Sequence, residues 1–193
     1  MTAGGTAGAT KGPTSGRLIA LEGTGGRGMS VAARRLERSF RPARAAAGVS
    51  GWDASGIFFE IAQGARGIPA PPAQTLVLLY AADLAFRLRW EIRPALAAGR
   101  TVVAAPYVDT AVAFGRAAGV PAGWLTNLFR FAPPAAERHF VTAERGAACD
   151  DGFVGLASQR VHGVDRRARR KLIGGAAAHL RAEAKRRARR TKR

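Results

Sequence analysis

The chain has 193 residues, 47% of them hydrophobic, which is enough for one domain of ordinary size with a buried core. It carries 31 Lys and Arg against 13 Asp and Glu, a formal net charge of +18, and only one cysteine, Cys149. This composition excludes an internal disulfide framework, and no apolar run approaches the roughly 20 residues of a transmembrane helix. We therefore expect a cytoplasmic protein without a membrane partner.

The basic residues are concentrated near the C-terminal end. Residues 166–193 contain 13 Lys and Arg and a single acid, Glu183. Residues 1–16 are instead rich in Gly, Ala, Thr and Ser and have no apolar stretch, a composition typical of a disordered leader. The sequence thus predicts a leader (1–16), a globular domain (17–163) and a basic helical tail (164–193).

The first regular elements are expected around a glycine cluster. Residues 18–21 form an apolar run short enough for a buried strand, and an Ala- and Arg-rich helix is expected over residues 31–47, interrupted near Pro42. Residues 49–56 should form a loop, in which Asp53 or Ser55 caps a helix over residues 57–64.

The second half of the predicted domain alternates between helices and strands. Residues 74–98 have apolar positions at helical spacing, with Pro94 expected to bend or divide the helix and Gly99 to end it. Further strands are predicted at 101–105, 139–143 and 161–163, and a helix at 122–131. Strands separated by helices are typical of an α/β fold with a parallel β-sheet flanked by helices.

A strand, a glycine-rich turn and a helix form the setting of a phosphate-binding loop, where backbone N–H groups converge on an anion. Against G-x-x-x-x-G-K-[ST], Gly23 and Gly28 occupy the glycine positions, Ser30 the hydroxyl position and Met29 the lysine position. Methionine cannot stabilise the charge of a transferred phosphate. A tight turn without a ligand explains the same pattern. The candidate phosphate-binding residues are Gly23, Thr24, Gly25, Gly26, Arg27, Gly28, Met29 and Ser30.

The order of segments over residues 17–143 resembles thymidylate kinase, a nucleoside monophosphate kinase of the P-loop class. Three stretches carry the resemblance: Leu21-Glu-Gly, the central segment with Leu78-Leu-Tyr-Ala-Ala-Asp and Glu91-Ile-Arg-Pro-Ala-Leu, and the segment from Val102 to Phe114. The resemblance implies a P-loop NTPase-type parallel sheet, ATP and Mg²⁺ as cofactors, dTMP as substrate, and pairing into a homodimer through a helix face.

The charged groups of that family are missing at the matching positions. Met29 replaces the lysine, Ala105 and Pro106 replace an Asp-Arg pair, and Leu84 replaces a phosphate-gripping arginine. An acidic residue and a glutamine are replaced by Gly25 and Gly115. Three positions still match the family. Ser30 lies at the Mg²⁺ position, Tyr80 at the position of the aromatic ring that stacks on thymine, and Tyr107 directly after the positions of the Asp-Arg pair.

Phosphoryl transfer depends on cations that meet developing negative charge. The sequence therefore predicts a catalytically impaired relative that binds nucleotide weakly at most. The alternative is an active dTMP kinase with relocated cations, for which Arg27, Arg87 or Arg116 are candidates. Arg160, Arg166 and Arg167 are candidates for the arginines of the family's lid. His139 and His162 have no metal-ligand partners at useful spacing.

The basic tail supports a third hypothesis, a nucleic-acid-associated scaffold. The tail is expected to be a helix over residues 165–193, interrupted at Gly174-Gly175, with a narrow apolar stripe of Leu172, Ile173 and Leu180. Its cations could neutralise phosphates without reading sequence, since the tail has no aromatic residue. A solvated tail without a partner is the competing interpretation. The candidate residues are Arg166, Arg167, Arg169, Arg170, Lys171, Lys185, Arg186, Arg187, Arg189 and Arg190.

Overall fold

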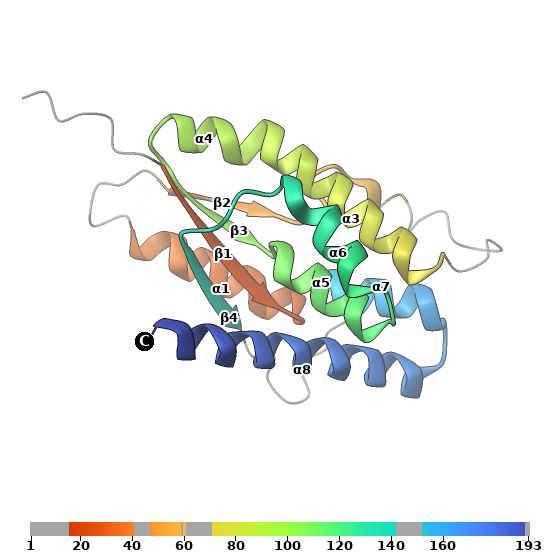
Figure 1. Cartoon of the computed structure of the whole chain (residues 1–193). Helices are drawn as coiled ribbons and strands as arrows, with labels where there is room; N and C mark the ends of the chain where they lie inside the picture. The colour runs from red at the N-terminus through yellow and green to blue at the C-terminus, as the bar shows by residue number, and fades with distance from the viewer. Residues whose placement is uncertain (1–15, 41–46, 59, 61–70, 142–151, 192–193) are drawn as a thin grey trace, which may run out of the picture.

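Four parallel strands, in the order β2-β3-β1-β4, form the centre of the molecule (Figure 1). They are β1 (Arg17–Gly23), β2 (Ala47–Gly51), β3 (Thr101–Ala105) and β4 (Glu137–Val141). The computed structural model describes residues 16–40, 47–58, 60, 71–141 and 152–191. The predicted α/β class with a parallel sheet flanked by helices is confirmed.

The two central strands are buried on both faces. In β1 and β3, Leu18 pairs with Val102 and Ile19 with Val103, and none of these four side chains is more than 4% exposed. Side chains alternate across a strand, so Leu18 and Val102 join one core cluster and Ile19 and Val103 the other. This two-sided burial explains why each strand contains a continuous apolar run, residues 18–21 in β1 and 102–105 in β3.

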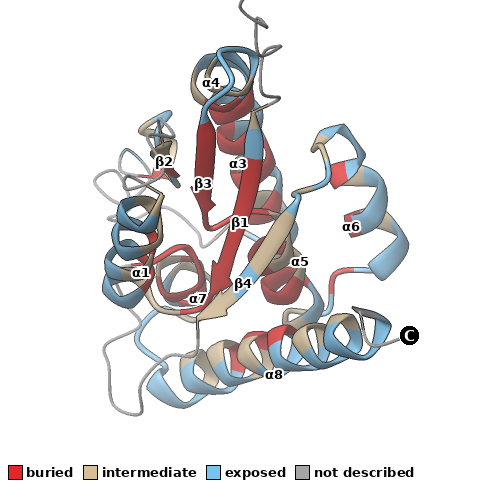
Figure 2. Ribbon diagram, turned by 90° about the vertical axis from the view of Figure 1, so that its left-hand side faces the viewer, coloured by how far each residue is buried: buried red, intermediate tan, exposed pale blue. Residues whose placement is uncertain are grey.

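Helices cover both faces of the sheet (Figure 2). On one face lies α1 (Gly26–Ser39), which buries Met29 and Ala33 against β1 and β3. On the other lie α3 (Ala73–Arg87) and α5 (Val108–Ala117). Two more helices follow, α6 (Ala122–Leu128), which continues as the 3-10 turn η3 (Phe129–Phe131), and α7 (Phe153–His162). The helix predicted over 122–131 is thus confirmed.

The long helix predicted over residues 74–98 is present and divided near Pro94. After α3 comes a π-helical turn, η2 (Leu88–Ile92), and then α4 (Arg93–Ala97). Proline has no N–H to donate to the preceding turn, and a π-helical turn accommodates the missing bond. Gly99 follows with φ of 72°, the left-handed conformation that ends a helix at little cost for glycine.

The C-terminal helix, α8 (Arg166–Thr191), is continuous. Asp165 caps it, because its Oδ1 accepts hydrogen bonds from the backbone N–H groups of Arg167 and Ala168. The predicted interruption at Gly174-Gly175 is wrong. Gly175 lies against α5, where an added Cβ would be 3.1 Å from the Cβ of Ala117, so the glycine permits close helix packing.

Three other predictions differ from the structure. The strand predicted at 161–163 is wrong, because these residues end α7. The strand predicted at 139–143 begins two residues earlier, at Glu137, and β2 occupies part of the predicted 49–56 loop. Helix α1 ends at Ser39. Pro42, Cys149, the 1–15 leader and most of the 57–64 helix lie outside the described residues.

Candidate functional site

The glycine-rich segment is a short turn followed by a helix. β1 ends at Gly23 and α1 begins at Gly26, so only Thr24 and Gly25 connect them. The predicted phosphate-binding residues Arg27, Gly28, Met29 and Ser30 therefore lie within α1. No side chain caps the start of this helix. The N–H groups that remain for an anion are thus those of the first turn of α1.

The side chains at the lysine and hydroxyl positions of the motif are both engaged within the protein. Met29 is 4% exposed and packs against Ile19, Leu21 and Val103. The hydroxyl of Ser30 donates a 3.4 Å hydrogen bond to the Gly26 carbonyl within the same helix. Within the described ranges, no group of three or more His, Cys, Asp or Glu residues could hold a metal ion.

The start of α7 covers the turn. A Cβ added at Gly152 would lie 2.9 Å from both the backbone N and the Cα of Gly26. The cavity that remains between the turn, Trp52, Pro106 and Phe153 measures about 70 Å³, whereas small-molecule sites usually have about 300–1,000 Å³. The cavity between these described residues is therefore smaller than usual small-molecule sites.

Tyr80 is part of the core and not a wall of an open slot. It is fully buried, and its hydroxyl donates a 2.5 Å hydrogen bond to the Tyr107 carbonyl. The ring of Phe153 lies 4.5 Å from the Tyr80 ring and also contacts Trp52, Phe58 and Phe114. Phe153 therefore occupies the space in which a base would stack on Tyr80.

The segment that replaces the Asp-Arg pair is held by a buried arginine. The Ala105–Pro106 peptide bond is cis, and the Pro106 carbonyl accepts a 2.8 Å hydrogen bond from Nη2 of Arg87. Nη1 of Arg87 lies 3.9 Å from the carboxylate of Asp83. Of the three arginines considered as replacement cations, Arg87 is buried, whereas Arg27 and Arg116 are exposed.

Tyr107, which directly follows the Ala105–Pro106 segment, ties it to the segment before β4. Its hydroxyl donates a 2.8 Å hydrogen bond to the Pro133 carbonyl. Burial raises the pKa of Tyr107 to about 12 and that of Tyr80 well above its usual value. Both side chains therefore act as neutral hydrogen-bond donors at neutral pH, which suits a structural role.

Sequence reasoning missed a buried carboxylate at the end of β1. Glu22 is fully buried and accepts hydrogen bonds from the N–H groups of Tyr107, Asp109 and Thr110 at 3.3, 3.0 and 2.9 Å. Burial, together with the nearby charge of Asp109, raises the pKa of Glu22 to about 7. Glu22 thus caps α5, because its carboxyl oxygens accept N–H groups of the first turn of that helix. Its position between an apolar run and the glycines was the available signal.

A second buried carboxylate ties α3 to the segment after β2. Asp83 accepts hydrogen bonds from the N–H groups of Asp53 and Ser55 and from the Ser55 hydroxyl, at 2.9–3.1 Å. Asp53 itself accepts a 2.8 Å hydrogen bond from the N–H of Phe58, as its predicted capping role requires. These contacts hold Trp52 and Phe58 beside Phe153.

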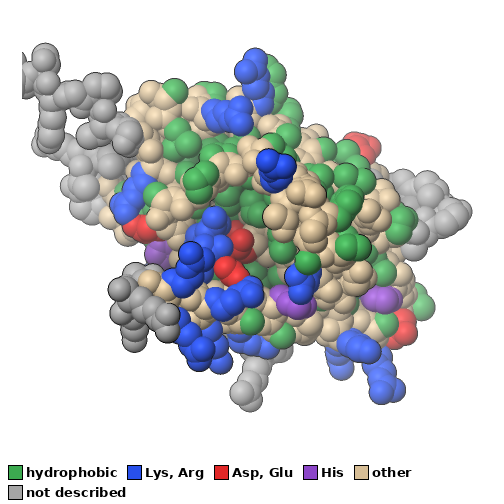
Figure 3. Space-filling view, in the orientation of Figure 1, with side chains coloured by type: hydrophobic (Ala, Val, Ile, Leu, Met, Phe, Trp, Pro, Cys, Tyr) green, Lys and Arg blue, Asp and Glu red, His purple; other side chains and the backbone are tan. Residues whose placement is uncertain are grey.

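The basic residues form the outer side of α8. Leu172, Ala176 and Leu180 are buried, and α8 packs mainly against α5 and α7. Many of the Lys and Arg side chains gather along the edge of the molecule where α8 lies (Figure 3). Nine basic residues of this helix are exposed: Arg166, Arg167, Arg170, Lys171, Arg181, Lys185, Arg186, Arg189 and Arg190.

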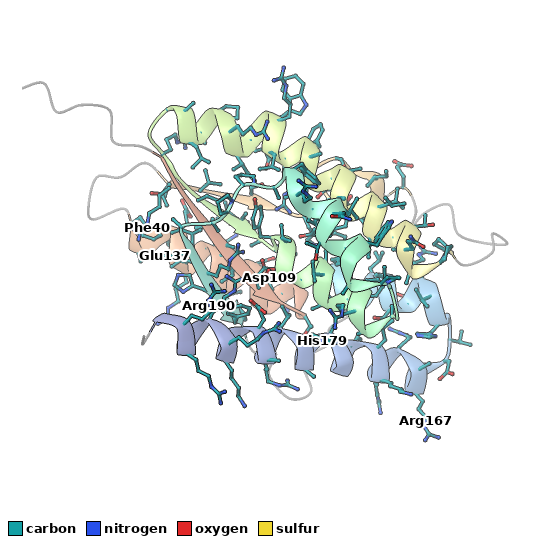
Figure 4. The ribbon with its side chains drawn as sticks, in the orientation of Figure 1. Phe40, Asp109, Glu137, Arg167, His179 and Arg190 are labelled. Atoms are coloured by element: carbon teal, nitrogen blue, oxygen red, sulfur yellow. The ribbon has the colours of Figure 1, made fainter. Side chains whose placement is uncertain are left out.

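Two further cations of α8 are half-buried. Arg187 lies 2.8 Å from the carboxylate of Glu183 and 3.6 Å from that of Asp109, and Arg169 is the other. Arg186 also pairs with Glu183. Figure 4 shows Asp109 close to α8, and Arg167 and Arg190 near its opposite ends. The contact of Arg187 with Asp109 fastens α8 to α5, and most of the other cations are left facing outward.

The remaining predicted residues do not gather at one site. Arg160 is half-buried near the end of α7, and Arg166 and Arg167 are exposed at the start of α8. His139 lies beside Glu137, at 3.2 Å. Exposed apolar side chains on consecutive turns of α3 and η2 offer a face for a homodimer, which stays a prediction; they are Leu78, Phe86 and Trp90.

No model of a known protein family matches the chain, and no curated protein is similar to it. The resemblance to thymidylate kinase therefore remains a hypothesis drawn from residues. Among the described residues, no helix is long and apolar enough to span a bilayer.

Proposed function

We propose that this chain is a non-catalytic P-loop-like protein that binds the phosphates of nucleic acid through the exposed cations of α8. The observation that carries the proposal is the division of α8 into two sides. Leu172, Ala176 and Leu180 pack on the domain, and nine Lys and Arg side chains are exposed. Such a surface neutralises phosphates without reading base sequence.

The packing of α8 favours nucleic acid over a membrane. A membrane-surface helix needs an exposed apolar face beside its basic one. The apolar stripe of α8 is already in contact with the protein, and it therefore cannot serve a bilayer. The helix has 26 residues and thus a length of roughly 39 Å. Because the helix is already packed on the domain, its backbone needs no further ordering when its cations bind a phosphate backbone.

The glycine turn supports a scaffold role for the rest of the domain. The order β2-β3-β1-β4, with a glycine turn between β1 and α1, is compatible with a P-loop-like fold. However, Met29 is buried and Phe153 fills the space beside Tyr80. We propose that ATP, Mg²⁺ and dTMP bind weakly at most. dTMP-dependent ADP formation above about 1 s⁻¹, an ordinary rate for kinases, would instead establish the active kinase.

The test uses two variants with the same loss of charge. In one, Arg167, Lys171 and Arg189 on the outer side of α8 become glutamine. In the other, the same change is made at Arg34, Arg35 and Arg38, which are exposed on α1. Binding of labelled DNA is measured by fluorescence anisotropy over a series of salt concentrations. Each lost phosphate contact should lower the slope of log K against log salt by about one.

We expect the α8 variant to lose most of the affinity for DNA and its slope of log K against log salt to fall by about two to three. The α1 variant should lose much less affinity, and its slope should change less. Equal losses in both variants would mean that only the net charge of +18 matters. That result, or wild-type protein that fails to retain DNA at low salt, would overturn the proposal.

A further inference from the structure

Two hollows lie next to each other along one flank of α8. The larger measures about 440 Å³ and lies between α8 and the carboxyl ends of β1 and β4, where it is lined by Glu22, Thr24, Phe140 and Val141. The smaller measures about 290 Å³, and its described lining residues belong to α8. Both are lined by Ile173, so together they follow the flank of the helix.

Cations line both ends of this groove. Arg166, Arg169 and Arg170 line the smaller hollow, and Arg181 and Lys185 line the larger one. From residue 166 to residue 185 the helix rises by roughly 28 Å. A polyanion of that length, with apolar groups between its charges, would match this pattern of cations.

The middle of the groove is apolar. Ile173, Ala177 and Leu180 of α8 face Phe140 and Val141 of β4 across the larger hollow. Phe140 is half-buried, and its ring thus supplies the aromatic surface that α8 itself lacks. The volume of about 440 Å³ falls within the range of small-molecule sites. Parallel sheets also bind ligands at the carboxyl ends of their strands.

We infer that the groove binds a single strand of nucleic acid, with phosphates on the two cation clusters and one base against Phe140 in the larger hollow. Grooves that combine cations with an aromatic ring are the usual way to bind single strands. A paired base is stacked within a duplex and cannot enter the hollow. This inference rests on the proposed function and adds a preference for single strands over duplex.

The groove would recognise a planar base together with a phosphate. A free nucleotide has both groups, as a strand of nucleic acid does. A nucleotide meets only the cations of the larger hollow, Arg181 and Lys185, whereas a strand meets both clusters. Replacing Arg166 and Arg170 by glutamine should therefore weaken binding of a strand and leave binding of a mononucleotide unchanged. Tighter binding of the mononucleotide than of the strand would overturn the inference.

The main experiment compares a labelled oligothymidylate of about ten nucleotides with a duplex of similar length, at the same salt concentration. Three single variants are measured. Phe140→Leu removes the ring, Ala177→Phe fills the hollow, and Ala178→Phe is the matched control, because Ala178 is exposed and does not line the hollow. Circular dichroism and thermal unfolding show whether each variant is folded.

We expect the strand to bind more tightly than the duplex. Phe140→Leu and Ala177→Phe should each lower affinity for the strand at least about fivefold, with little effect on the duplex. Ala178→Phe should change neither. Equal binding of strand and duplex, or equal effects of Ala177→Phe and Ala178→Phe, would overturn the groove while leaving the role of α8 intact. Failure of wild-type protein to bind either ligand would instead overturn the proposed function.

Discussion

The Thr110 hydroxyl donates a 2.6 Å hydrogen bond to the buried carboxylate of Glu22. The two residues are 88 positions apart and join the end of β1 to the first turn of α5. Thr110 also accepts a 3.1 Å hydrogen bond from the N–H of Gly23. This pair thus fixes the backbone at the start of the glycine turn, and the conformation of the turn depends on it.

The first prediction concerns the pH dependence of stability through Glu22. Burial raises the pKa of Glu22 from 4.5 to about 7, so the folded state binds more protons than the unfolded state between these pH values. The contribution of Glu22 to the free energy of unfolding is therefore largest below about pH 4.5 and falls as pH rises to about 7. The fall amounts to about 3 kcal/mol.

Glu22→Gln provides the comparison, because it has the same shape and does not titrate. Urea unfolding of both proteins at several pH values from 5 to 8 gives the difference in stability. We expect the advantage of the wild-type protein to shrink as pH rises. A difference that stays constant, or that grows with pH, would show that burial does not raise the Glu22 pKa.

The second prediction concerns Met29, the residue at the lysine position of the motif. Met29→Lys places an ammonium group among Ile19, Leu21 and Val103, with no described carboxylate in that cluster. We expect it to lower the free energy of unfolding by about 3 kcal/mol or more, without any gain in ATP turnover. Met29→Leu conserves volume and should cost less than about 1.5 kcal/mol.

Chemical denaturation and ADP formation check this prediction on the same samples. If Met29→Lys were as stable as Met29→Leu and formed ADP, the turn would be a phosphate-binding loop that lacks only its lysine. The interpretation that several catalytic groups are missing together would then be wrong.

The strands that the sequence predicted best are those that are buried on both faces. Residues 18–21 and 102–105 are apolar throughout because each side of β1 and β3 meets a helix layer. β2 gives no such signal, since it contains Gly48 and Gly51 and lies at the edge of the sheet. It is a strand because of its pairing with β3, for example Val49 with Val103, and this pairing cannot be read from its own composition.

The candidate site was harder to predict, because its main contacts are far apart in sequence. The motif selected Met29, but the direction of its side chain depends on which side of α1 faces the sheet. Phe153 gave no signal of its own. Its neighbours Trp52, Phe58 and Tyr80 come from segments more than 70 residues away, and only the fold brings them together. The apolar stripe of α8 was predicted from the sequence, whereas α5, the helix on which it mainly packs, was not.

The third prediction concerns Phe153, whose ring is 2% exposed. Phe153→Ala removes the ring from between Trp52, Phe58, Tyr80 and Phe114 and leaves a cavity lined by aromatic side chains. We expect a loss of about 3–5 kcal/mol in the free energy of unfolding. Phe153→Leu fills most of the space and should cost clearly less.

Isothermal titration of folded Phe153→Ala with thymidine tests what the cavity accepts. We expect weak binding that wild-type protein does not show, because in the wild type Phe153 occupies the space. A loss below about 1 kcal/mol for Phe153→Ala would contradict the central position of this ring in the core.

The fourth prediction concerns the adjacent glycines of α8. An added Cβ meets nothing within 4 Å at Gly174, but at Gly175 it meets Ala117 of α5 at 3.1 Å. Gly174→Ala should therefore raise the free energy of unfolding by about 0.5–1 kcal/mol through helix propensity alone. Gly175→Leu should lower it by about 1–3 kcal/mol, because α8 must move away from α5. Thermal unfolding of the two variants measures both effects.

If Gly175→Leu were as stable as Gly174→Ala, α8 would not be packed on α5, and the cations of α8 would lie on a separate tail. A stabilised Gly174→Ala beside a destabilised Gly175→Leu would mean that this basic helix is an integral part of the fold.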